Sequence, residues 1–200
     1  MSSTIFPAFF EHNDYFIDEK VGLLKFNNAY KVYNSDGIQI GNVQQSTSTG
    51  EKLLRLLLSK SMLPFRLDIK DTEGVVLATI KRGWTLFMSK IHVLDANGVE
   101  IASIKQKFKF FKPTFLILDP AGAQIGKISG DWKAWNFTIA DNADRPIGTI
   151  TKKWNGILKE ALTTADKYVV SIQPNVVDQA KKIILVATSI TIDMVLKESA

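Results

Sequence analysis

The feature that most constrains the fold of this chain is a turn sequence that occurs five times, as in VLDANGVEIASI at residues 93–104. In each copy the turn opens with Asp or Asn, and Gly, or once Asp, follows three residues later. Alternating apolar residues flank the turn on both sides. The first residues are Asn34, Asp71, Asp95, Asp119 and Asp141, and the residues three positions on are Gly37, Gly74, Gly98, Gly122 and Asp144. These residue types suit tight turns and left-handed backbone. The repeat predicts five β-hairpins, and therefore about ten antiparallel strands.

Two further strands are expected, near residues 15–26 and around residues 168–172. About twelve antiparallel strands in one chain must close or stack, because an open sheet leaves unpaired edges. Roughly eight strands already make a barrel whose interior is just filled by its own side chains. A barrel of about twelve strands therefore needs another segment inside it.

The C-terminal segment KIILVATSITIDMVLKESA can fill that space. Residues 183–196 contain only four polar residues, which are Thr188, Ser189, Thr191 and Asp193. A helix of this length spans roughly 21 Å, whereas a bilayer core of about 30 Å needs roughly 20 apolar residues. A membrane anchor is the alternative, and both the length and Asp193 disfavour it. We expect a helix buried in the barrel, with the Asp193 carboxylate held by a structural partner.

Length and a hydrophobic content of 46% fit one globular domain over residues 1–200. Within it we expect a loose segment at 1–8, a helix at 50–60 and the central helix at 175–197. No Lys or Arg precedes Lys20, and no cleavage pattern follows an apolar run, so we expect no signal peptide and a cytoplasmic location. The chain has no Cys, which excludes disulfides, thiolate metal sites and palmitoylation.

Six further segments are distinctive: LPFRLDIKD (63–71), FFKPTFLILD (110–119), GDWKAWNFTIAD (130–141), KKWNG (152–156), LKEALTTADKY (158–168) and ITIDMVLKE (190–198). Together they resemble the phospholipid scramblase family. LURP-one-related proteins and the Tubby C-terminal domain share the architecture of that family. The resemblance implies a mainly β fold: a twelve-stranded antiparallel Tubby-like barrel enclosing a C-terminal hydrophobic α-helix. Scramblases are associated with calcium-triggered movement of phospholipid between leaflets, and Tubby domains with phosphoinositide binding.

The same resemblance implies a calcium loop before the terminal helix, matched here by residues 163–172. Asp166 is kept, whereas Thr164 stands where an acidic ligand is expected and Val169 replaces a glycine. Calcium takes six to eight oxygen ligands, and one carboxylate cannot supply them. We therefore carry over Asp166 alone as a metal-loop residue, and we expect no cofactor.

The candidate binding surface is KQKFKFFK at residues 105–112. Side chains alternate along a strand, so Lys105, Lys107 and Lys109 share one face while Phe108 and Phe110 share the other. This surface suits anionic headgroups, at about 1 kcal/mol for each basic residue near an anionic membrane. Other basic or aromatic residues join it if the barrel brings them near; they are Lys112, Lys81, Arg82, Lys152, Lys153 and Trp154. The alternative is a solvated face over a Phe-packed core.

Other classes of function find less support. The Phe side chains face away from the lysines and the net charge is only +5, so a nucleic-acid surface is not expected. His12 and His92 are 80 residues apart, and no phosphate-binding loop, dinucleotide fingerprint or nucleophile elbow occurs. Asp71, Asp95 and Asp119 are turn residues by position. We expect no enzyme chemistry.

The sequence thus favours a scramblase-related barrel that binds anionic membrane phospholipid peripherally, at the inner membrane face. Lipid translocation is a further activity that the resemblance implies. The alternative is a non-catalytic structural or protein-interaction barrel that binds no lipid.

Overall fold

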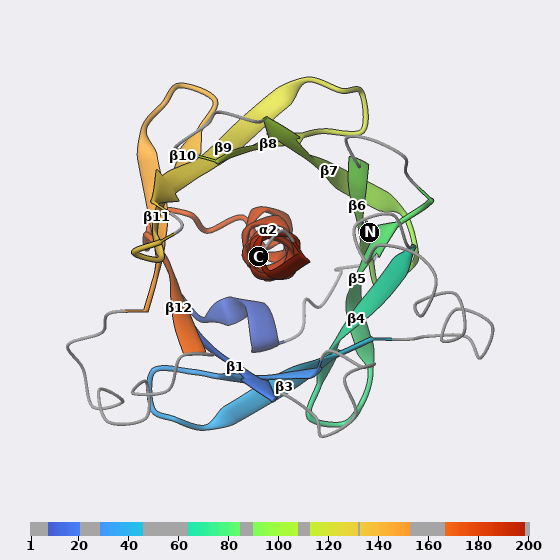
Figure 1. Cartoon of the computed structure of the whole chain (residues 1–200). Helices are drawn as coiled ribbons and strands as arrows, with labels where there is room; N and C mark the ends of the chain where they lie inside the picture. Colours follow the sequence, from blue (N-terminus) through green and yellow to red (C-terminus); the bar gives the residue numbers. More distant parts are fainter. Residues whose placement is uncertain are drawn as a thin grey trace.

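Twelve antiparallel strands close into a barrel around one long helix (Figure 1). The computed structural model describes residues 8–20, 29–45, 64–84, 90–107, 113–131, 133–152 and 167–198. The strands are β1 (Asp14–Lys20), β2 (Ala29–Tyr33), β3 (Gln39–Gln45), β4 (Phe65–Asp71), β5 (Val76–Arg82), β6 (Lys90–Asp95), β7 (Glu100–Lys107), β8 (Thr114–Leu118), β9 (Gln124–Asp131), β10 (Asn136–Asp141), β11 (Pro146–Thr151) and β12 (Lys167–Ile172). Each strand pairs with its neighbours in sequence, and β1 pairs with β12 to close the ring. The predicted fold class is confirmed.

The tight turns are built as their Asp and Asn residues predict. Between β6 and β7, the Oδ1 atom of Asp95 accepts the backbone N–H groups of Asn97 and Val99, both at 2.9 Å. Gly98 has a φ of 79°, and Asp144 holds the equivalent position in the last hairpin with a φ of 63°. The pairing shifts by one residue beside the turn in all five of these hairpins. Each hairpin therefore has a β-turn closed by a hydrogen bond between residues three apart, then a left-handed residue and a bulge, so local contacts fix its register.

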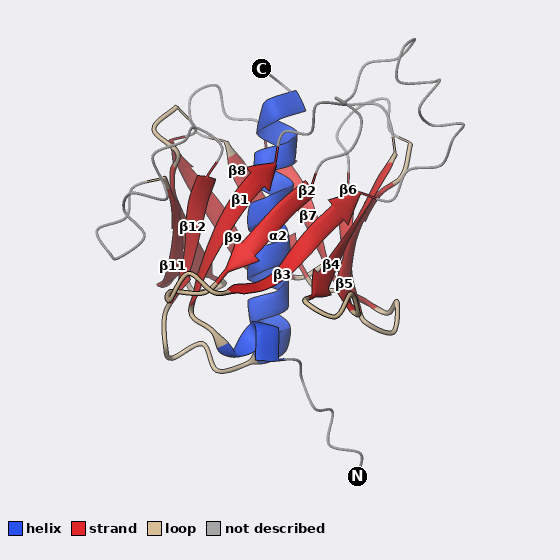
Figure 2. Cartoon of the chain, turned by 90° about the horizontal axis from the view of Figure 1, so that it is seen from below, coloured by secondary structure: helices blue, strands red, loops and turns tan. Residues whose placement is uncertain are grey.

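Helix α2 (Gln179–Glu198) runs through the barrel (Figures 1 and 2). Every side chain over residues 183–195 is at most 8% exposed. The hydroxyls of Thr188, Ser189 and Thr191 donate to carbonyl oxygens one turn earlier in the same helix, at 2.6 to 2.9 Å. These buried hydroxyls therefore need no partner on the strands. The C-terminal segment is core, as predicted.

The helix begins at Gln179 rather than at 175, because Asp178 caps it. Its Oδ1 atom accepts the backbone N–H of Lys181 at 3.3 Å, and its carbonyl accepts that of Lys182 at 3.1 Å. No helix within the described ranges is long and apolar enough to cross a membrane.

The two ends of the barrel are built differently (Figure 2). One end carries the five tight turns and the start of α2, and we call it the turn end. The other end carries the opposite ends of the same strands, together with the end of α2, and we call it the connection end.

A short 3₁₀ helix, η1 (Ala8–Glu11), packs against α2 at the turn end. Its Phe9 and Phe10 side chains are buried. The Lys182 ammonium, itself buried, donates to the backbone oxygens of Glu11 and His12 and to Asn13 Oδ1, at 2.9 to 3.3 Å. Burial lowers the pKa of Lys182, and the nearby Glu11 charge opposes that shift. These contacts connect the beginning of the described chain to the central helix.

Two predicted segments lie wholly or almost wholly outside the residues that the structure describes. The loose segment at 1–8 lies outside the described residues except for Ala8, which begins η1. The helix predicted at 50–60 lies wholly outside them.

Candidate functional site

Five cationic side chains and one histidine lie together on the outer surface of β4 to β7. We call this group the basic face, and its members are Arg66, Lys81, Lys90, His92, Lys105 and Lys107. Lys81 lies opposite both Arg66 and His92, and Lys90 lies opposite Lys105. Adjacent strands are about 4.8 Å apart, so the barrel places these side chains in neighbouring rows near the connection end.

The basic face carries more positive charge than the described acids compensate. Arg66 Nε lies 2.9 Å from Asp68 Oδ1. Glu100 serves two partners, at 2.9 Å from His92 Nδ1 and 3.9 Å from Lys90 Nζ. Lys81, Lys105 and Lys107 are exposed and form no ion pair with any described residue.

The opposed cations carry an energetic cost. Like charges directly across a strand pair are destabilising, and two such pairs occur here, Arg66 with Lys81 and Lys90 with Lys105. Pairing across these strands therefore does not by itself favour the arrangement of the cations.

Arg82 does not share this surface, contrary to the expectation that grouped it with Lys81. Consecutive residues of a strand point to opposite sides, so Lys81 faces outward and Arg82 faces the barrel interior. Arg82 is only 4% exposed, and its guanidinium lies 4.7 Å from the centre of the Phe65 ring. This arginine belongs to the core of the connection end.

Lys152 lies elsewhere on the barrel. It directly follows β11, four strands from β7 in the ring, and its ammonium lies 4.4 Å from the centre of the Trp135 ring. Trp135 in turn packs against Tyr168 at a ring separation of 5.5 Å. The structure therefore separates Lys152 from Lys81, Lys105 and Lys107.

The remaining predicted site residues lie outside the described residues. They are Lys109, Lys112, Lys153, Trp154 and the metal-loop residue Asp166. Within the described ranges, no three or more His, Asp or Glu side chains are grouped so that they could hold a metal ion.

No sequence argument had singled out Arg66, Lys90 or His92 for this site. A usable signal was present in the turns. Lys90 lies five residues before Asp95 and Lys105 six residues after Val99, so the hairpin with its one-residue bulge places them opposite each other. Lys81 joins the basic face through the pairing of β5 with β6. These two strands belong to different hairpins, so no tight turn specifies their pairing.

A second polar group lies inside the connection end. Asp193 is 1% exposed, and its Oδ2 atom accepts the Tyr30 hydroxyl at 3.1 Å. Burial and the Asp193 charge raise the pKa of Tyr30 well above its usual value, and the same two causes, in the same order, raise that of Tyr168. The Tyr168 hydroxyl is buried without a hydrogen-bond partner among the described residues. The expected structural partner of Asp193 is thus a tyrosine on β2.

The fold and the site define a closed β-barrel with a central helix and a positively charged outer face. The family model for Scramblase matches residues 22–199, and the chain belongs to that family. Comparison with curated proteins found no match, and comparison with solved structures found none either.

Proposed function

We propose that this scramblase-family barrel binds anionic membrane phospholipid peripherally, through its basic face. The observation that carries the proposal is the row of cations across β5 to β7, where Lys81, Lys105 and Lys107 have no acidic partner among the described residues. Each basic residue near an anionic bilayer contributes about 1 kcal/mol. Three such residues contribute roughly 3 kcal/mol together, as an attraction that salt weakens and that needs no covalent chemistry.

The distribution of charge along the barrel supports one orientation. The basic face lies toward the connection end, whereas the turn end carries the turn carboxylates Asp71, Asp95, Asp119 and Asp141. An anionic surface attracts the first region and repels the second. In the proposed complex the barrel therefore meets the membrane with the outer wall of β5 to β7, and the tight turns point away from it.

The test is co-sedimentation with vesicles of neutral or anionic phospholipid, in salt from about 50 to 500 mM. We expect binding to anionic vesicles only, and weaker binding as salt screens the charges. Replacing Lys81, Lys105 and Lys107 together with Glu should weaken binding by roughly 100-fold or more, since the loss of three contacts alone corresponds to about this factor and the new carboxylates add repulsion.

A matched control replaces Lys31, Lys70 and Lys133 with Glu, which changes the net charge equally at positions outside the basic face. This control should keep most of the affinity. Unchanged binding by the folded Lys81, Lys105 and Lys107 variant, or an equal loss in the control, would overturn the proposal in favour of a protein-interaction barrel. Once binding is established, a lipid-transfer assay on the same vesicles tests translocation.

A further inference from the structure

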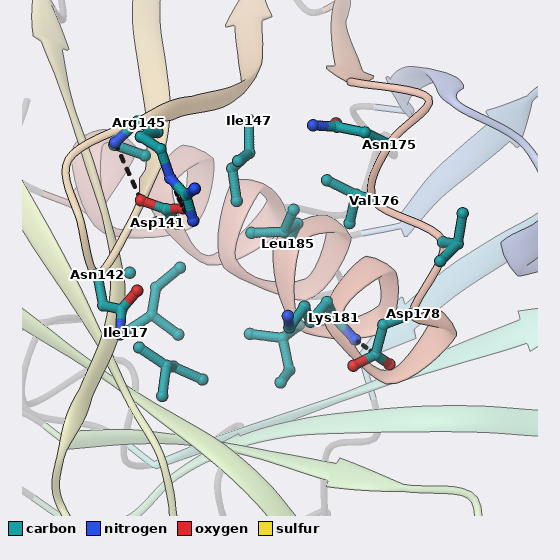
Figure 3. Close-up of a pocket in the computed structure, with 15 residues that line it drawn as sticks. Ile117, Asp141, Asn142, Arg145, Ile147, Asn175, Val176, Asp178, Lys181 and Leu185 are labelled. Carbon is teal, nitrogen blue, oxygen red and sulfur yellow. Dashed lines mark hydrogen bonds and ion pairs between the residues drawn. The ribbon is translucent and has the colours of Figure 1, made fainter.

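A cavity of about 380 Å³ opens at the turn end of the barrel (Figure 3). It lies among β8, β9, the hairpin of β10 and β11, the segment before α2, and the first turns of α2. Its apolar wall is formed by Ile117, Ile125, Ile147, Val176, Ile184 and Leu185. Its volume falls in the range of roughly 300 to 1,000 Å³ that small-molecule sites occupy.

Apolar side chains at this cavity remain open to water. Val177 is 81% exposed and Ile125 is 36% exposed, although both line the cavity. They add exposed apolar surface to the apolar wall, so a hydrocarbon chain that entered would cover part of this surface. Burial of that surface is favourable at about 25 cal/mol per Å².

The charged side chains around the cavity leave one cation available. Arg145 is engaged by Asp141, which accepts from its Nε at 2.8 Å and from a terminal nitrogen at 2.7 Å. Asp178 is the helix cap. Lys181 is exposed, and its ammonium forms no ion pair with any described residue. Figure 3 shows the Asp141–Arg145 pair on one side of the cavity and Lys181 on the other.

We propose that this cavity binds a single-chain amphiphile with an anionic headgroup, its hydrocarbon chain against Ile147 and Leu185 and its headgroup beside Lys181. The cavity volume of about 380 Å³ suits one short chain rather than the two acyl chains of an ordinary phospholipid. The site is distinct from the basic face, because Lys105 and Lys107 lie at the far end of β7 from the turns. A carboxylate and a phosphate monoester share the chemistry that Lys181 recognises.

The experiment is calorimetric titration of the full chain with four ten-carbon probes, each below its micelle concentration: decanoate, decyl phosphate, decanol and decylammonium. Decanoate and decyl phosphate should bind most tightly, and the tighter of the two identifies the headgroup. Amide shifts in two-dimensional NMR spectra should concentrate at Val176, Val177 and Lys181. Absence of binding by both anions, or equal binding of decylammonium, would refute the assignment.

Two variants locate the site. Val177→Asp places a repelling charge at the exposed mouth and should weaken decanoate binding roughly tenfold, while Lys181→Met should weaken it roughly two- to fivefold, as an exposed ion pair predicts. Val75→Asp is the matched control, since Val75 is a 55% exposed apolar residue on a different turn. An equal loss in this control would overturn the location. Anionic vesicle binding should be unchanged in Val177→Asp, so the two proposals fail separately.

Discussion

At the scale of single residues, the interior of the connection end contains two tyrosines in unlike situations. Tyr30 donates its hydroxyl hydrogen bond to Asp193, a residue 163 positions later in the chain. Tyr168 is equally buried, but its hydroxyl has no hydrogen-bond partner among the described residues. The same chemical change, removal of the hydroxyl, should therefore have opposite effects at the two positions.

We expect Tyr30→Phe to lower the free energy of unfolding by about 1 to 3 kcal/mol, because a buried carboxylate loses a donor. Tyr168→Phe should leave stability unchanged or raise it by up to about 1 kcal/mol, because an unsatisfied buried hydroxyl is removed. Denaturant unfolding at neutral pH measures both. Equal losses in the two variants would show that Tyr168 has a partner that the described residues do not include.

At the scale of elements, α2 is the segment on which the barrel depends. Its residues 183–195 are buried, and the helix contacts β5, β6, β7 and β12 as well as η1. Removing this helix would leave the inward side chains of twelve strands around a space that they cannot fill.

Truncation before Lys182 should therefore abolish soluble folding. A full-length test is Ile190→Asp, which buries a carboxylate at a position that is 0% exposed and should cost several kcal/mol. Thr191→Val is the control, because the Thr191 hydroxyl bonds only to its own helix at Ala187, and its loss should change stability by less than about 1 kcal/mol. Thermal unfolding followed by circular dichroism distinguishes these outcomes, and a cooperative transition in the truncated chain would contradict the role given to α2.

At the scale of the whole molecule, unfolding exposes three buried tyrosines together. Burial, the largest cause, and neighbouring carboxylates raise the pKa of Tyr15, Tyr30 and Tyr168 above the usual value near 10. A pKa that is higher in the folded state gives stability that is fully present below pH 10 and is lost as the pH rises above it, where only the unfolded chain ionises readily.

The free energy of unfolding should fall above about pH 10, by up to about 1.4 kcal/mol per pH unit for each tyrosine. Denaturant midpoints measured from pH 8 to about pH 11.5 test this expectation. In Tyr168→Phe, stability should fall less steeply with pH, by the contribution of one titrating tyrosine. The lowered pKa of Lys182 acts in the opposite direction just below pH 10.5. Subtracting the profile of the variant from that of the unaltered chain removes this contribution, because Lys182 is present in both. Parallel pH profiles for the two chains would contradict it.

Much of the barrel could be predicted, because its hairpins are specified locally. Asp95 bonds to N–H groups two and four residues away, and Gly98 takes a conformation that few other residues tolerate. Such contacts are visible in a sequence window of about ten residues. The basic face was predicted only in part, because Lys81 and Lys105 come together through the contact of β5 with β6 and of β6 with β7. Arg82 was misplaced although period-two alternation, a local rule, would have turned it inward.

The sequence by itself thus determined the five hairpins, the outward direction of Lys105 and Lys107, and an apolar C-terminal helix that needed an enclosing fold. Only the tertiary structure decided the pairing of β1 with β12, the bond between Tyr30 and Asp193, and the cavity beside Lys181. The physical reason is the separation along the chain of the groups that interact. Turn hydrogen bonds join atoms a few residues apart, whereas closure, core polar pairing and cavities depend on how elements distant in the chain pack together.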